Sequence, residues 1–219
     1  MRTAMAVWAI FLAQGAAAET LTRVLVVSPQ VASRPSETHA ALVLSNTSFS
    51  GDITFRGRVQ TVRQLRVGSP PNPWECAWVV WNYHGGRFYY LALKPGGWEI
   101  GKHDKAFHDH QKFLRTGDTP HEMGVWHDFE ITQTGNEIRV QLNGVEVAAF
   151  LDTVRPYKAG QIGFYTEDAE IQVDDVTSPF NDDFEDYPLQ SISKDGHRLK
   201  NWFMQFLGHG GASISLRPK

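Results

Sequence analysis

Hydrophobic and polar residues alternate one by one from Asp52 to Gln60. Ile53, Phe55, Gly57 and Val59 occupy one set of positions, and Asp52, Thr54, Arg56, Arg58 and Gln60 occupy the other. A period of two over nine residues is typical of a β-strand with one buried face. The alternation therefore predicts a strand here, with two arginines on its open face.

The chain from Trp74 to Val176 continues as short apolar and aromatic runs separated by turns. Residues 74–83, 88–93 and 98–101 predict a three-stranded meander, with turns at Gly85-Gly86 and Pro95-Gly96-Gly97. Both faces of residues 74–83 are partly apolar, so we expect that strand to be central and covered. Further strands are predicted at 126–132, 137–142, 145–150, 162–166 and 170–176, with Asn143-Gly144 as a type I′ hairpin turn. The pattern predicts an all-β protein, a sandwich of two antiparallel sheets.

The two ends of the chain and one internal segment depart from this pattern. Residues 1–18 predict a signal peptide, because Arg2 precedes a short apolar stretch and Ala16 and Ala18 suit cleavage. We expect the sandwich to span 19–179, with 180–219 as a C-terminal extension packing on it, since 40 residues rarely hold a core alone. The polar residues 104–119 predict a long surface loop, with a short helical turn as an alternative for part of it.

The composition of the chain indicates its cellular compartment and excludes some classes of binding partner. The predicted signal and the lack of a second long apolar run indicate a secreted or periplasmic protein without a membrane span. A net charge of −3 gives no electrostatic reason to expect nucleic acid. Cys76 is the only cysteine, which excludes an internal disulfide, and its apolar neighbours indicate a buried, inert thiol.

Aromatic and polar residues on neighbouring predicted strands indicate sugar binding. Seven tryptophans in 219 residues are many, and indole and phenol rings stack on sugar rings while Arg, Lys and Glu bind hydroxyls. The candidate ligand-binding residues are Arg56, Arg58, Trp78, Tyr90, Lys94 and Glu99. We expect them to bind an oligosaccharide or polysaccharide on a concave face lined by aromatic residues and arginine.

The strand order resembles that of the concanavalin A-like lectin/glucanase superfamily, in particular laminin G-type domains and the 3-keto-disaccharide hydrolase domain family. The matching segments are Gly124–Ile131, Gly135–Gly144, Gly160–Tyr165 and Ile171–Val176. The resemblance covers roughly residues 41–176 and implies a jelly-roll sandwich. It also implies a structural Ca²⁺ near the closing strand, where Asp174, Asp175, Asp182, Asp183 and Glu185 supply oxygen ligands.

Two other functions stay open at this point. A glycoside hydrolase acting on a disaccharide or an envelope glycan needs two carboxylates, for which Glu75, Glu99 and Asp104 are the candidates. The Glu-x-Asp-x-x-Glu strand of laminarinase-type enzymes is absent from the sequence. A structural sandwich that mediates protein contacts is the third function considered. A zinc site is a further hypothesis, with candidate ligands at His103, Asp104, His108, Asp109 and His110.

Overall fold

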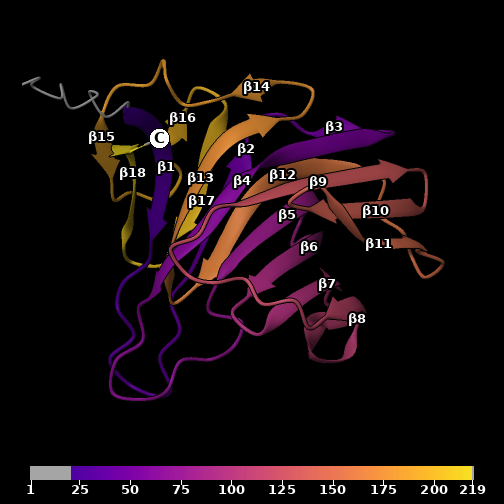
Figure 1. The fold of residues 1–219 in the computed structure, drawn as a ribbon, viewed down its shortest axis with the longest axis horizontal. Coiled ribbons are helices and arrows are strands. Elements are labelled where there is room, and N and C mark those ends of the chain that lie inside the picture. Colours follow the sequence, from indigo (N-terminus) through magenta and orange to yellow (C-terminus); the bar gives the residue numbers. More distant parts are fainter. Residues whose placement is uncertain (1–20, 219) are drawn as a thin grey trace, which may run out of the picture.

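The computed structural model describes residues 21–218, which form two antiparallel sheets of nine strands each (Figure 1). This architecture confirms the predicted all-β jelly-roll sandwich. The predicted signal peptide, residues 1–18, lies outside the described residues. Within the described residues, no helix is long and apolar enough to cross a membrane.

One sheet is built around the alternating segment found in the sequence, and we call it the β4 sheet. Its main order is β11-β10-β9-β4-β13-β1-β18-β15, with β14 beside β13. The strands are β1 (Leu21–Ser28), β4 (Ile53–Gln64), β9 (His127–Thr134), β10 (Glu137–Leu142), β11 (Val145–Leu151), β13 (Ala169–Thr177), β14 (Asn181–Asp182), β15 (Gln190–Ile192) and β18 (Gly211–Pro218).

The second sheet contains the predicted meander, and we call it the β5 sheet. Its main order is β16-β17-β2-β12-β5-β6-β7-β8, with β3 beside β12. The strands are β2 (Ala40–Ser45), β3 (Phe49–Ser50), β5 (Ala77–His84), β6 (Arg87–Lys94), β7 (Gly97–His103), β8 (Gln111–Gly117), β12 (Ala159–Glu167), β16 (Arg198–Leu199) and β17 (Trp202–Leu207). Strand β5 is buried on both faces, as its doubly apolar pattern predicts.

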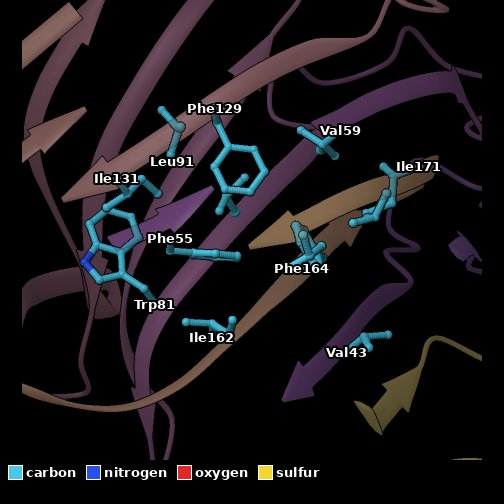
Figure 2. Packing of buried hydrophobic residues seen from close by; sticks show 14 of the residues in the cluster. Val43, Phe55, Val59, Trp81, Leu91, Phe129, Ile131, Ile162, Phe164 and Ile171 are labelled. Carbon is cyan, nitrogen blue, oxygen red and sulfur yellow. The ribbon is translucent and has the colours of Figure 1, made fainter. Parts of the chain in front are cut away.

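The inner faces of the two sheets enclose an aromatic core (Figure 2). Phe55 on β4 packs edge-on against Phe129 on β9, with ring centroids 5.0 Å apart, and lies 5.9 Å from Phe164 on β12. The two rings from the β4 sheet thus meet a ring from the β5 sheet. Residues 53, 55 and 59 are all buried, so the face predicted by the alternation is the core face.

The last thirty residues contribute strands to both sheets. Strand β18 pairs with β1 along its length, from Leu21 opposite Pro218 to Ser28 opposite Gly211. Strand β17 pairs with β2 in the other sheet, and Trp202 on β17 lies 5.6 Å from Phe164 of the core. Figure 1 shows β18 beside β1.

The loop predicted over 104–119 contains the short helical turn that the sequence allowed, but the prediction is wrong for residues 111–117, which form a strand. A short 3₁₀ turn, η1 (His108–His110), leads into β8, the edge strand of the β5 sheet. Strand β8 pairs with β7 from Trp98 opposite Gly117 to His103 opposite Gln111. This strand has no clear apolar pattern in the sequence. An edge strand is stabilised by pairing with its neighbour and can carry mostly polar, exposed side chains.

Candidate functional site

The outer face of the β5 sheet carries a second apolar cluster, separate from the core. Its buried members are Leu42, Leu44, Cys76, Trp78, Val80, Phe88, Tyr90 and Ala92. Strands β2, β5 and β6 thus place apolar side chains on both faces. Burial raises the pKa of the Cys76 thiol, so this cysteine is a packing residue with little thiolate character.

Strand register aligns one row of side chains across this outer face. Tyr165 on β12 lies opposite Trp78 on β5, Trp78 opposite Ala92 on β6, and Ala92 opposite Glu99 on β7. The ring centroids of Trp78 and Tyr165 are 5.3 Å apart, and those of Trp78 and Tyr90 are 4.6 Å apart. The row leads from an aromatic cluster to the Glu99 carboxylate.

A cavity of about 250 Å³ opens at this carboxylate, and we call it the Glu99 cavity. It is lined by Trp74, Trp78, Lys94, Glu99, Gln111, Phe113 and Glu167. Trp74 precedes β5 and Phe113 lies on β8, so they come from elements on either side of β6 and β7. Trp74 is 46% exposed and Phe113 is 62% exposed, which leaves aromatic surface available to a ligand.

The polar groups of the Glu99 cavity hold one another in position. The Tyr90 hydroxyl donates a hydrogen bond of 2.7 Å to Glu99 Oε1, and Lys94 Nζ donates one of 2.9 Å to Oε2. Gln111 Nε2 donates to the Tyr90 hydroxyl at 3.0 Å. A carboxylate oriented by two donors is fixed before any ligand arrives, which favours selective hydrogen bonding.

Glu167, at the end of β12, is the second carboxylate of the Glu99 cavity. Burial raises the pKa of Glu167, and the charges of Asp168 and Glu75 act in the same direction. The Tyr165 hydroxyl donates a hydrogen bond to Glu167 and partly offsets these effects. The Glu167 carboxyl therefore holds a proton more readily than an exposed glutamate does.

A buried arginine fixes the chain on two sides of the Glu99 cavity. Arg66 Nε contacts Glu75 Oε1 at 2.5 Å, and its Nη2 contacts Asp168 Oδ2 at 2.6 Å. Glu75 is adjacent to Trp74, and Asp168 is adjacent to Glu167. Because both carboxylates are fully buried, these ion pairs position the backbone of two cavity residues.

The predicted ligand-binding residues divide between the two sheets. Trp78, Lys94 and Glu99 line the Glu99 cavity, and the Tyr90 hydroxyl is hydrogen-bonded to Glu99 and Gln111. Arg56 and Arg58 lie on β4 in the other sheet. The expectation of one common face is wrong, because residues 65–76 carry the chain from one sheet to the other.

The two arginines lie at a separate pocket on the outer face of the β4 sheet. Arg56 Nε lies 2.8 Å from Glu130, and Arg58 Nε lies 3.0 Å from Asp128. Arg58 also lies over the Trp126 ring at 5.4 Å. The guanidinium groups are therefore already paired with carboxylates on the neighbouring strand β9.

The three predicted catalytic carboxylates lie in three different environments. Glu99 lines the Glu99 cavity, whereas Glu75 is fully buried against Arg66. Asp104 accepts a hydrogen bond from the Tyr157 hydroxyl at 3.2 Å and lies 3.7 Å from Arg155. A hydrogen bond from the Ala106 amide is the largest influence on Asp104 and holds its pKa below the ordinary value. The structure thus does not bring Glu75 or Asp104 together with Glu99 in the cavity.

The acidic residues predicted to bind calcium have protein partners. Asp182 Oδ2 accepts hydrogen bonds from Tyr187, Asn201 and Trp202 at 2.6, 3.0 and 2.8 Å. Arg58 lies 3.8 Å from Asp175, and Arg23 lies 3.5 Å from Glu185. Asp174 is buried, while Asp183 accepts a hydrogen bond from the Glu185 amide. Calcium binding stays a prediction.

The histidines of the zinc hypothesis lie at and beside η1. His108 lies 2.8 Å from Asp109, with both side chains largely exposed, and His103 contacts the Gly86 carbonyl oxygen. Between residues 21 and 218, no three His, Cys, Asp or Glu side chains are grouped so that they could hold a metal ion.

Four cavity residues were not among the predicted ligand-binding residues: Trp74, Gln111, Phe113 and Glu167. Gln111 and Phe113 lie on β8, the strand that was not predicted because its residues are mostly polar. Trp74 was expected within a strand, yet it lies in the segment before β5. Glu167 lies one residue beyond the predicted strand 162–166. The position of Trp74 directly after a proline-rich loop is the one signal for it in the sequence.

The 3-keto-alpha-glucoside-1,2-lyase-like domain family matches residues 51–177. The chain belongs to this family. The match confirms the resemblance predicted from the strand order, and it includes every residue that lines the Glu99 cavity. No curated protein sequence matches the chain.

Solved structures of low sequence identity are similar to this family member. Carbohydrate-binding module CBM66 from Bacillus subtilis has a TM-score of 0.54 and 15% identity, covering 70% of this chain and 92% of that chain. A human galectin-16 variant has a TM-score of 0.45 and 18% identity, covering 64% and 94%. The first similarity supports the sandwich fold.

Proposed function

We propose that this member of the 3-keto-alpha-glucoside-1,2-lyase-like domain family is an exported protein that binds a glycan in the Glu99 cavity. Trp74 and Phe113 offer exposed aromatic surface to the apolar faces of sugar rings. Glu99, Lys94 and Gln111 offer oriented donors and acceptors to sugar hydroxyls.

The observation that carries this proposal is the combination of exposed aromatic walls with a hydrogen-bonded carboxylate. Sites for small polar ligands are concave and largely apolar, with a few fixed polar groups that set orientation. The named fold neighbour from Bacillus subtilis is itself a carbohydrate-binding module. This resemblance agrees with the proposal, which rests on the side chains of the cavity.

A glycan array followed by calorimetry on the bound sugar tests this function. We expect Trp74→Ala and Phe113→Ala each to weaken binding roughly tenfold, because each removes one stacking surface. Leu151→Ala is the matched control, since Leu151 is 61% exposed on β11 in the other sheet. Unchanged affinity in both aromatic variants, or no bound glycan on the array, would contradict the proposal.

A second candidate function is proton-transfer chemistry on a sugar held in the same cavity. Two observations favour it: the family includes lyase-like domains, and the Glu167 pKa is raised in a cavity shared with Glu99. A carboxyl group whose pKa is raised is better suited to act as a general acid than an ordinary glutamate.

Product analysis after incubation with a 3-keto-α-glucoside distinguishes the two functions. Enzymatic turnover should be lost in Glu167→Gln and in Glu99→Gln, while Glu167→Gln retains ligand affinity. Binding without any product in the wild-type protein would leave glycan binding as the function of the cavity.

A further inference from the structure

A second cavity lies at the end of the sandwich where the β5–β6 hairpin meets the segment before β12. Its volume is about 370 Å³, and we call it the Arg87 cavity. It is lined by Ser48, Asn82, His84, Arg87, Pro156, Tyr157, Lys158, Ala159 and Gly160. These residues include two permanent cations and one histidine but no carboxylate. The Glu99 cavity, in contrast, contains two carboxylates.

Within the part of the chain that the structure describes, the cations of the Arg87 cavity are not neutralised by ion pairs. Among residues 21–218, neither Arg87 nor Lys158 lies within ion-pair distance of a carboxylate. The charge of Arg87 acts on Asp104, a carboxylate that is also held by the Ala106 amide, the Tyr157 hydroxyl and Arg155. A cavity lined by two cations and no carboxylate is electrostatically suited to an anion.

Strand pairing brings the basic groups together. His84 lies directly opposite Arg87 across the hairpin. Two basic side chains directly opposite each other bring no favourable pairing energy of their own. An anion that accepts hydrogen bonds from both residues would bridge them.

A β-bulge on β5 shapes a wall of the Arg87 cavity. Its extra residue shifts the register against β6 between Trp81 and His84, and against β12 between Gln161 and Gly163. Asn82 at this bulge has a φ of 52°. Its side-chain amide turns inward and donates to Gln133 and to the Tyr157 carbonyl oxygen, each at 3.0 Å. Bulges commonly redirect side chains at sheet rims beside binding sites.

The backbone of the Arg87 cavity is tightly held. A Cβ atom on Gly160 would lie 2.3 Å from the Asn82 carbonyl carbon, so only glycine permits this approach. The Tyr157 amide donates to the Tyr89 hydroxyl at 3.0 Å, and buried Lys102 donates to the Arg155 carbonyl oxygen at 3.2 Å. Arg87 lies over the Tyr157 ring at 5.9 Å, which orients its guanidinium group.

We propose that the Arg87 cavity is a second ligand site that binds an oxyanion, a carboxylate or sulfate group carried by an acidic sugar. Arg87 presents paired N–H donors to the anion, while Lys158 and His84 add charge and the Ser48 hydroxyl adds a further donor. The site uses none of the residues of the Glu99 cavity, so it stands independently of the function proposed there.

Titrations of the ¹⁵N-labelled protein with sodium glucuronate, sodium sulfate and glucose test this site. We expect glucuronate and sulfate to shift the amide resonances of residues 158–160, and glucose to leave them unchanged. If glucuronate alone binds, the ligand is a sugar carboxylate; if sulfate binds as well, the site accepts oxyanions generally. Equal shifts with glucose, or none with either anion, would overturn the proposal.

Charge-removing variants locate the anion. Arg87→Gln and Lys158→Gln should each raise the dissociation constant for glucuronate about tenfold, because each removes a charged donor. Lys194→Gln is the matched control, since Lys194 is exposed and lies outside the cavity. All three side chains are exposed, so thermal melts should show that the variants remain folded. Affinity unchanged in both cavity variants would contradict the site, whereas retained affinity in Trp74→Ala would separate it from the Glu99 cavity.

Discussion

Gly101 lies beneath the phenol of Tyr90, and a Cβ atom on Gly101 would lie 2.2 Å from the Tyr90 hydroxyl oxygen. The two residues are directly opposite each other on β7 and β6. Only a residue without a side chain lets the Tyr90 ring lie across β7 and reach Glu99 and Gln111. The geometry of the Glu99 cavity therefore depends on this glycine.

Replacing Gly101 should disturb both folding and ligand binding. We expect Gly101→Ala to lower the free energy of unfolding by about 1–3 kcal/mol, because the added methyl group overpacks a buried ring. The variant should also bind the glycan more weakly, since Tyr90 can no longer orient Glu99. Urea unfolding and calorimetry measure the two effects. Gly96→Ala is the control, because its Cβ would meet nothing within 4 Å; equal behaviour of the two variants would contradict the argument.

The buried Arg66 should be one of the most sensitive charged positions. Arg66→Met leaves Glu75 and Asp168 buried without their counter-charge, and we expect a loss of about 3–5 kcal/mol in the free energy of unfolding. Chemical denaturation at pH 7 measures it. Arg63→Met, at an exposed ion pair with Glu170, should cost less than about 1 kcal/mol. Similar losses in the free energy of unfolding in the two variants would show that burial of the Arg66 ion pairs does not increase their effect on stability.

A buried histidine pair should make the protein less stable in mild acid. The rings of His121 and His127 are 4.7 Å apart, and burial lowers the pKa of both. Below about pH 6.5 these histidines take up protons in the unfolded chain before they do so in the folded protein. The free energy of unfolding should therefore fall as the pH falls from about 7 toward the folded-state pKa values.

Comparison with variants isolates the contribution of the pair. His121→Gln and His127→Gln should each reduce the dependence of the free energy of unfolding on pH. Denaturant melts of each variant and of the wild type at several pH values measure this difference. The comparison is needed because burial raises the pKa of Asp174 to about 6. Asp174 takes up its proton in the folded state first, so it stabilises the protein as the pH falls from 6 toward 4. An unchanged slope in both variants would exclude the histidine pair as the cause.

The predicted calcium can be tested directly by thermal melts. If Ca²⁺ binds at the carboxylates near β14, melts in CaCl₂ should show a higher midpoint than melts in EDTA, because a ligand that binds only the folded state stabilises it. The shift should disappear in Asp174→Asn or Asp183→Asn and persist in Asp118→Asn, an exposed control. Identical melting midpoints in CaCl₂ and EDTA would show that these carboxylates do not bind Ca²⁺ and contribute only to the fold.

Much of the sandwich could be predicted because local sequence carries the period of a strand. Residues 137–142 were predicted as a strand and form β10 with the same limits. The core face of β4 followed from its alternation. Strand β8 could not be predicted, because its stability comes from pairing with β7 and its own residues lack a clear apolar face.

The candidate site was predicted less completely than the fold. Residues 78, 90, 94 and 99 lie close together because a hairpin meander keeps sequence neighbours adjacent in space. Arg56 and Arg58 were grouped with them because they alternate on a strand, yet sequence alone does not say which sheet a strand joins. Trp74 and Glu167 reach the cavity through contacts between distant segments, which Arg66 holds in place.

The sequence by itself determined the class of fold, the face of β4 that is buried in the core, the burial of Cys76 and the family. Each of these depends on local periodicity, on neighbouring residues or on motif order. Tertiary structure alone decided which polar groups share a cavity, because that depends on sheet order and strand register. It paired Arg56 and Arg58 with carboxylates, placed Glu167 beside Glu99, and gathered Arg87 and Lys158 around a second cavity.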